Sequence, residues 1–276
     1  MTGKKWALLG ILTSVVVVLV LTLVFTGGDS ASDNEDVPPT AAPPGSPASS
    51  SAPAAAGRTV SDLLGRPVTI VDAPGGQPVE QTGEPTPFPE GTEAVAAPAG
   101  LSLQQVPSGV TLMVSDSDGP TAVEGDVMTG YAQSPVGAAL VTANYMGLGF
   151  ELGPIYADFL EHYARQLVAE DPTLLDEVRA RGQANDGRAL NAAEGYSAPR
   201  WFRFSSCTPE FCTVEAAMPS VADVVGNSEV KTIDVSPTAH PVVRVSLAWD
   251  DGGWQMVSTQ SLPPVEELDR SWVQWI

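Results

Sequence analysis

Two cysteines and two histidines are the side chains of this 276-residue sequence whose types most readily do chemistry. Cys207 and Cys212 are the only cysteines, and four residues, including Pro209, separate them. An even number of closely spaced cysteines is typical of a disulfide in an exported protein, and a bridge here would pin a hairpin between two strand ends. A metal site would need two further ligands, and both histidines lie far away in the sequence. We therefore predict a structural disulfide between Cys207 and Cys212, not a redox or metal site.

The two histidines are weak candidates for acid–base catalysis. His162 follows Asp158 by four residues, so the two would lie on one helix face and could form an acid–base dyad. On the polar face of a helix, however, such a pair is more often a surface contact. His240 precedes Pro241 at the expected start of a strand, and no acidic residue lies near it in the sequence. We expect neither histidine to be catalytic.

The sequence lacks the motifs of familiar enzymes and cofactor sites. It contains no G-x-S-x-G nucleophile elbow, no H-E-x-x-H zinc motif, no Gly-rich phosphate loop and no calcium-binding loop. A turn explains Asp250 and Asp251, and the flanking Trp249 and Trp254 are expected to contact each other across paired strands. We therefore predict that the protein is not an enzyme and that it has no cofactor or metal.

A membrane anchor is expected near the N-terminus. Residues 6–26 carry no charged side chain, and an apolar helix of about 20 residues crosses the hydrocarbon core of a bilayer. Lys4 and Lys5 precede this run and acidic residues follow it, which places the N-terminus in the cytosol and the C-terminal domain outside the cell. The alternative is a cleaved signal peptide, although its apolar region would be unusually long. We predict a single-pass cell-membrane protein, with residues 1–28 as cytosolic tip and transmembrane helix.

Two segments of low apolar content follow the anchor. Residues 29–57 are dominated by Ala, Pro, Ser and Gly, a composition that cannot bury enough apolar surface to fold, so we expect a disordered stalk. Residues 58–97 are predicted to be extended and poorly ordered, with a short helical turn at Val60–Leu64 and a strand at Pro67–Val71. The sequence leaves open whether this segment packs on the domain that follows.

Residues 98–276 are predicted to form one exported α+β domain. About three helices are expected, beginning at Ser134-Pro135 and then spanning Pro154–Glu170 and Pro172–Gly182. Beyond Gly195 the apolar period changes to two, which is typical of antiparallel strands. The candidate strands there are Arg200–Ser206, Phe211–Met218, Val230–Val235, Val242–Trp249 and Trp254–Gln260, and a separate short strand, Val110–Val114, is expected before the helices. Helices packed on a four- to five-stranded antiparallel sheet make an α+β fold.

The chain ends with apolar side chains that rarely stay in water, namely Trp272, Trp275 and Ile276. Two interpretations remain open. The first is a tail that packs against the sheet or forms a final edge strand. The second is a segment that docks on a partner subunit.

Short motifs in the domain carry a resemblance to known families. The hairpin sequence Trp249-Asp-Asp-Gly-Gly-Trp254, after helices and an antiparallel sheet, resembles the cone-shaped nuclear-transport-factor-2-like, or cystatin-like, domains. Gly119-Pro120, the stretch Gly130–Ala139 and Ser271-Trp272-Val273 are similar to a family of actinobacterial exported proteins with one N-terminal anchor and a low-complexity stalk. The resemblance covers about residues 100–276.

The resemblance implies a structural role. Broader relatives include assembly proteins of conjugation and type IV secretion machines, whose exported domains of this fold act as scaffolds. The net charge of −20 argues against nucleic acid as a partner of the exported domain, because nucleic acid requires Lys/Arg patches. We predict a membrane-tethered scaffold or assembly subunit of a cell-envelope complex, with protein partners and an undetermined oligomeric state. The alternative is an extracytoplasmic domain that binds a small ligand inside the cone.

Overall fold

The computed structural model describes residues 57–62, 64–89, 94–150, 153–184, 198–220, 223 and 238–276. The predicted transmembrane helix within residues 1–28, the stalk up to residue 56 and the predicted strand Val230–Val235 lie outside these ranges. Among the described residues, no helix is both long enough and apolar enough to span a membrane.

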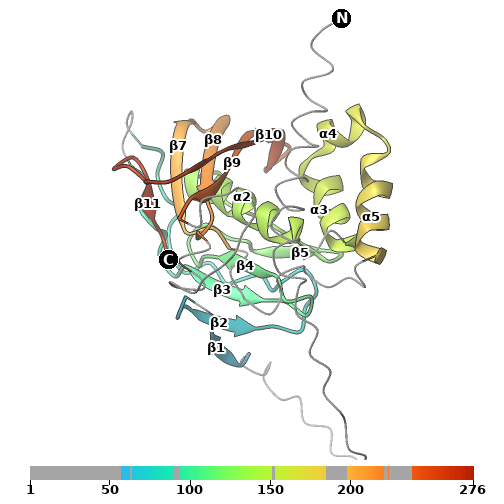
Figure 1. Ribbon diagram of the computed structural model, residues 1–276, viewed down its shortest axis with the longest axis horizontal. Coiled ribbons are helices and arrows are strands. Elements are labelled where there is room, and N and C mark those ends of the chain that lie inside the picture. The colour runs from blue at the N-terminus through green and yellow to red at the C-terminus, as the bar shows by residue number, and fades with distance from the viewer. Residues whose placement is uncertain are drawn as a thin grey trace, which may run out of the picture.

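The described chain has an α+β fold in which two sheets enclose one helix, as Figure 1 shows. The first sheet has the strand order β1-β2-β3-β4, the second has the order β10-β9-β8-β7-β11, and β5 and β6 form a separate hairpin. The strands are β1 Thr59–Ser61, β2 Pro67–Ile70, β3 Ser102–Gln105, β4 Thr111–Val114, β5 Ala122–Glu124, β6 Val127–Thr129, β7 Trp201–Cys207, β8 Phe211–Ala217, β9 His240–Asp250, β10 Gly253–Val265 and β11 Val273–Gln274. The helices are α2 Pro135–Gly149, α3 Pro154–Tyr163, α4 Arg165–Glu170 and α5 Leu174–Ala184.

Helix α2 lies between the two sheets and is buried along its whole length. It contacts β4 of the first sheet and β8, β9 and β10 of the second. Its sequence has no polar stripe, and a helix that is apolar on every side belongs in a core. The predicted start is confirmed, because the Ser134 hydroxyl caps the helix by accepting a 2.9 Å hydrogen bond from the Gly137 N–H.

One polar side chain of α2 ties the helix to the first sheet. The Asn144 side chain accepts a hydrogen bond from the Met113 N–H at 2.7 Å and donates one to the Met113 carbonyl at 3.0 Å. Strand β4 is the edge of its sheet, so these groups would otherwise lack partners in a buried position. Asn144 therefore replaces a neighbouring strand at this point.

The predicted helix Pro154–Glu170 is divided into α3 and α4. The break lies at the fully buried Ala164, whose φ of −127° and ψ of 36° are not helical. Before the break, the Tyr163 hydroxyl donates to the Met128 carbonyl of β6 at 2.7 Å. After it, Arg165 Nε donates to the Gln255 side chain of β10 at 3.1 Å. The two halves thus bond to different strands, and the domain has four described helices where the sequence predicted about three.

The extended, poorly ordered segment predicted for residues 58–97 is corrected in its described part. The predicted strand Pro67–Val71 is confirmed as β2, which pairs with β1 and lies parallel to β3, whereas the expected helical turn begins as strand β1. Val68 and Val95 are buried in the core. Further on, the N–H groups of Thr82 and Gly83 both donate to the Asp116 carbonyl. The composition of residues 58–97 did not indicate this packing, because their backbone groups pair with residues far away in the sequence.

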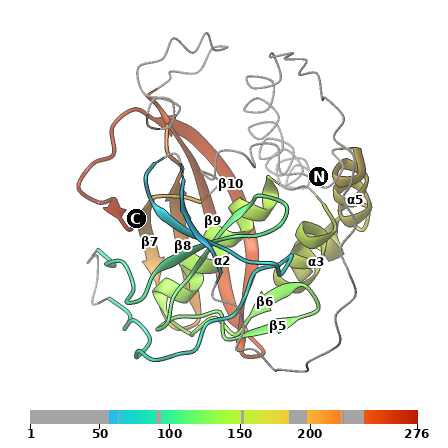
Figure 2. The same cartoon turned by 90° about the horizontal axis from the view of Figure 1, so that it is seen from below.

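The second sheet confirms four of the predicted strands, now β7, β8, β9 and β10, in an all-antiparallel order. Figure 2 shows β9 and β10 as long, curved strands beside α2. Their hairpin turns at Asp251 and Gly252, both with positive φ, as the Asp-Gly sequence favours. The predicted contact across the hairpin is confirmed, since the rings of Trp249 and Trp254 meet edge to face at 5.2 Å.

Candidate functional site

Side chains of the second sheet alternate between an inner face that packs on α2 and an outer face whose polar groups stay partly exposed. Phe202, Val214 and Leu247 point inward and are fully buried. The residues that alternate with these along each strand point toward the outer face. We define the outer face by six side chains that lie on adjacent strands: Arg203, Thr213, Glu215, Arg244, Ser246 and Gln260.

A row of charges crosses the middle of this outer face. Glu215 on β8 stands opposite Arg203 on β7 and Arg244 on β9. Arg203 Nε donates to one carboxylate oxygen at 2.7 Å, and Arg244 Nε donates to the other at 2.8 Å. Each arginine also donates through Nη2 to the same oxygen as its Nε. The carboxylate is only 1% exposed, whereas the arginine side chains are 31% and 39% exposed.

The two arginines determine how Glu215 titrates. Burial alone would raise the pKa of Glu215, but the hydrogen bonds from Arg244 and Arg203 and their charges outweigh it and hold this pKa below its ordinary value. Glu215 is therefore ionised in the folded protein at pH values where the unfolded chain already begins to bind a proton. The net charge of the row is positive, since two guanidinium groups share one carboxylate.

This titration predicts a loss of stability on acidification. A carboxylate with a lowered folded-state pKa stabilises the protein above its unfolded pKa, and this stability is lost as the pH falls through the folded pKa. We expect the midpoint urea concentration of the wild type to decrease as the pH is lowered below about 4.5, the region where an unperturbed Glu titrates. This decrease should be steeper for the wild type than for Glu215→Gln. The exposed Glu161→Gln serves as the matched control. If the urea midpoints of wild type and Glu215→Gln depend equally on pH, the pKa of Glu215 is not lowered in the folded protein.

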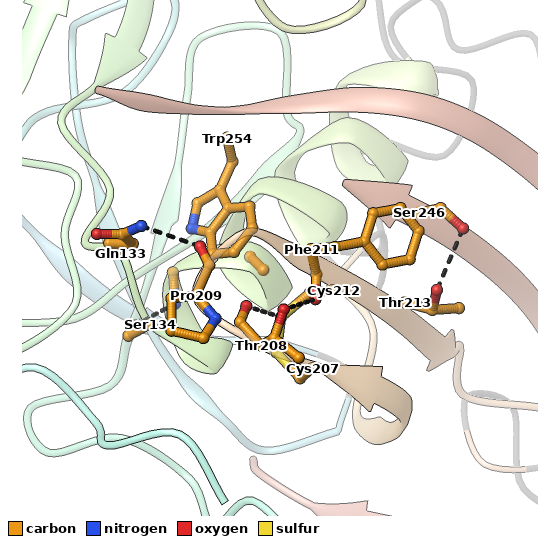
Figure 3. The surroundings of a disulfide bond; sticks show 12 residues. Gln133, Ser134, Cys207, Thr208, Pro209, Phe211, Cys212, Thr213, Ser246 and Trp254 are labelled. Carbon is orange, nitrogen blue, oxygen red and sulfur yellow. Dashed lines mark hydrogen bonds between the residues drawn. A yellow bond between two sulfur atoms is a disulfide. The ribbon is translucent and has the colours of Figure 1, made fainter. Parts of the chain in front are cut away.

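The predicted disulfide between Cys207 and Cys212 is present, and it joins directly opposed residues of β7 and β8. Figure 3 shows the bridge at the end of this hairpin, with Gln133 reaching the turn. The Gln133 side chain donates to the Pro209 carbonyl at 2.9 Å, which ties the hairpin to the residue before the α2 cap. In the part of the chain that is described, no three His, Cys, Asp or Glu side chains are grouped so that they could hold a metal.

Removal of the bridge is expected to destabilise the protein modestly. For so short a loop, the double variant Cys207→Ser/Cys212→Ser should lose about 2 kcal/mol of unfolding free energy. Urea unfolding of wild type and variant, each with and without dithiothreitol, measures this loss. The reductant should lower the midpoint of the wild type alone. An unchanged wild-type midpoint, despite thiol titration showing full reduction, would exclude a stabilising role.

The C-terminal residues wrap around the β7 edge of the second sheet. Trp272 lies on the outer side, where Arg203 stacks over its ring at 4.5 Å. Strand β11 then pairs with β7. Beyond it, Trp275 stacks on the inward-pointing Phe202 at a ring distance of 4.0 Å and donates a hydrogen bond to the Val95 carbonyl.

The structure therefore favours the packing tail and edge strand over the docking segment. Trp272 and Trp275 are 8% and 7% exposed, and Ile276 is half-buried with its carbonyl bonded to Arg200. Partner docking through these residues would first require the tail to leave the sheet.

His162 lines a shallow, open depression on the surface. The possible pairing of His162 with Asp158 is not seen, and Asp158 instead accepts a hydrogen bond from Arg179 at 3.2 Å. The nearest carboxylate is instead Glu124 of β5, 3.9 Å from the ring nitrogen. Burial lowers the pKa of His162, with Glu124 acting in the opposite direction. The depression is lined by Glu124, Gly125, Asp126, Val127, Asp158, Glu161, His162 and Arg165. Within this set, His162 and Glu124 lie at the distance of a long ion pair.

His240 has an acidic neighbour that the sequence did not indicate. Its Nδ1 lies 3.7 Å from the Asp223 carboxylate and 3.1 Å from the Met218 carbonyl. Its ring meets Trp201 edge to face at 4.7 Å. Asp223 itself accepts hydrogen bonds from the backbone and hydroxyl of Ser220. These contacts hold the start of β9, and Asp223 lies between the Ser220 hydroxyl and the His240 ring.

The Gly119-Pro120 motif that carries part of the resemblance borders a buried polar network. Asp118 is fully buried and accepts hydrogen bonds from the Thr86 N–H and hydroxyl and from the hydroxyls of Ser117 and Ser134. Gly119 has a φ of 99°, and a Cβ there would lie 2.8 Å from the Gly130 carbonyl. The network joins three distant segments and caps α2, so its geometry is that of a structural junction. The sequence indicated this stretch only through the resemblance that Gly119-Pro120 carries.

Comparison with known proteins assigns the chain to a family. A family model described as a domain of unknown function, DUF8175, matches residues 69–271. The chain belongs to the DUF8175 family. The DUF8175 region includes the Asp118 network, the charged row and the disulfide, whereas β1 and β11 lie outside it. No curated protein and no solved structure matches this chain.

Proposed function

We propose that this DUF8175 protein is a non-enzymatic, membrane-tethered scaffold or assembly subunit of a cell-envelope complex. The observation that carries the proposal is the outer face, where two partly exposed arginines are fixed by a buried carboxylate. Arginines held in this way are suited to contact another protein, because their rotamers are already restricted before binding.

The interior of the domain supports a scaffold more than a ligand-binding cone. Helix α2, buried throughout, occupies the inner face of the second sheet. Trp254 is fully buried beside it and donates its indole N–H to the Ala132 carbonyl at 2.9 Å. A small ligand on the inner face would have to displace this helix or these side chains.

The finer parts of the proposal rest on the sequence. The apolar run over residues 6–26 would hold the chain in the cell membrane, with the N-terminus cytosolic and the α+β domain outside. The resemblance to actinobacterial exported proteins and to cone-shaped cystatin-like domains points to a conjugation or type IV secretion apparatus. The partners are proteins, and the chain's net charge of −20 disfavours nucleic acid.

A detergent pull-down of the full-length protein at native expression tests the proposal. We expect subunits of an envelope-spanning machine to be recovered in constant ratio to the bait and identified by mass spectrometry. A control bait carries residues 1–57 on an unrelated folded domain, which separates partners of the anchor from partners of the α+β domain. Recovery of the full-length protein alone would overturn the proposal.

A further inference from the structure

We infer that the outer face of the second sheet is the docking surface for a different protein, which presents a carboxylate to Arg203 and Arg244. This inference rests on the proposed function and specifies which surface of the scaffold binds. It is drawn from three properties of that face, which are its exposed donor groups, its prior rigidity and its charge relative to the rest of the chain.

The arginines keep donor groups for a ligand. Both guanidinium groups use Nε and Nη2 to bind Glu215, so the Nη1 of each takes no part in that pairing. Arg203 Nη1 makes a long 3.3 Å contact with the Ser271 hydroxyl, and Arg244 Nη1 is not engaged by any described residue. A planar guanidinium edge matches the two oxygens of a carboxylate, so a second carboxylate can approach the row from outside.

Binding at this face would need little ordering of side chains. Glu215 fixes the two arginines from below, and Trp272 supports Arg203 through a ring contact at 4.5 Å. Interface arginines give most binding energy when their geometry exists before association. Strand β9 lies between β8 and β10, and β7 lies between β8 and the short β11, so both strands have hydrogen-bonded neighbours on each side.

The surroundings of the row define the shape of the partner. Thr213 and Ser246 lie next to it, with their hydroxyl oxygens 3.3 Å apart. Figure 3 shows the ring of Phe211 beside this pair, and its side chain is 38% exposed. An exposed aromatic next to small hydroxyl side chains and fixed arginines is a composition that protein interfaces favour. The partner therefore presents a carboxylate with apolar surface beside it.

Charge complementarity favours one carboxylate over an acidic segment. The two guanidinium groups and one carboxylate of the row sum to a positive charge on a chain whose net charge is −20, and Asp269, which accepts a hydrogen bond from Ser271, offsets part of it near Arg203. Glu210 and Asp250 lie at one end of the sheet, where the Trp249 N–H donates to the Glu210 carbonyl. These carboxylates would repel a strongly acidic partner, whereas a single carboxylate placed over the arginines would be attracted. The same repulsion acts against a second copy of this chain.

The test uses the full-length protein in its own cells, with a photo-crosslinking amino acid in place of Ser258. Ser258 is exposed and pairs with Ser246 of the outer face. The matched control position is Gln166, an exposed residue of α4. We expect a crosslink to a different protein from Ser258 and none to that protein from Gln166. A crosslink from Ser258 only to a second copy of this chain would overturn the inference.

Charge variants then test the arginines. Gln260 lies opposite Arg244 and is exposed, so Gln260→Glu would compete with the partner's carboxylate while Gln260→Lys would not. We expect Gln260→Glu and Arg244→Gln to reduce capture of the crosslinked partner by about tenfold, the size of a hot-spot change. Gln260→Lys should leave capture equal or increased, and thermal melting of each variant confirms that it is folded.

The outcomes separate this inference from the proposed function. If the wild type recovers envelope subunits, but Gln260→Glu and Arg244→Gln recover them equally well, the outer face is excluded and the scaffold stands. If Gln260→Lys weakens capture as much as Gln260→Glu, the effect is steric and the carboxylate is excluded. If the wild type recovers no partner, both proposals are wrong.

Discussion

Replacing Trp254 with alanine is expected to lower the free energy of unfolding by about 4 kcal/mol, the range for large-to-small changes in a core. Trp254 is fully buried, so its loss leaves a cavity between β10 and α2 that the surrounding side chains fill only in part. The variant also removes the donor to the Ala132 carbonyl, two residues before the α2 cap. Urea unfolding of the full-length protein in detergent, followed by circular dichroism, measures the change.

Trp249→Ala is the matched control for this prediction. Trp249 contacts Trp254 across the same hairpin but is only half-buried, so its removal leaves a smaller cavity. We expect a loss of about 2 kcal/mol, half that of Trp254→Ala, because less apolar surface is taken from the core. Equal losses for the two variants would show that the hairpin contact, and not the packing on α2, is what stabilises this region.

The second sheet could be predicted from sequence because its signals are local. Alternation of apolar residues marked β7 to β10, and Asp251-Gly252 marked the turn that joins the last two. The disulfide followed from two cysteines at a short spacing. In each case the residues that determine the structure lie close together in the chain.

The first sheet was predicted only in part: β2 and β4 match the expected strands Pro67–Val71 and Val110–Val114, whereas β1, β3 and the pairing of the four strands were missed because their determinants are distant. Its strands are only three or four residues long, too short for a clear period, and β2 pairs with β3 across more than thirty residues of Pro- and Gly-rich chain. The break at Ala164 was missed for a similar reason. The apolar stripe continues through it, and only bonds to β6 and β10 explain why the helix divides there.

The candidate site shows the same limit. Arg203, Glu215 and Arg244 each occupy an outward position in a predicted strand, so a polar face could be expected from alternation alone. That they meet in one row depends on strand register, which the sequence does not determine at these distances. For the histidines, closeness in the sequence suggested a contact that the structure does not contain. Asp158 is near His162 in sequence, yet its partner is Arg179, and Glu124 comes nearer to the ring.

Replacing Asp118 with alanine is expected to cost about 4 kcal/mol of unfolding free energy, because buried donors left without an acceptor are each destabilising by about 1–3 kcal/mol. Four donors on Thr86, Ser117 and Ser134 lose their acceptor in this variant. Ser134 also caps α2, so the loss reaches the helix between the sheets. Thermal and urea unfolding of the full-length protein measure the change.

Asp116→Ala is the matched control from the same loop. Asp116 is only half-buried, and its side chain accepts one hydrogen bond, from the Thr82 hydroxyl at 3.1 Å. Its removal should cost about 1 kcal/mol, the net value of one hydrogen bond. If Asp118→Ala costs no more than this control, the network does not stabilise the fold. Its carboxyl group would then need a role in binding, which would move the search for a functional site from the outer face to the start of α2.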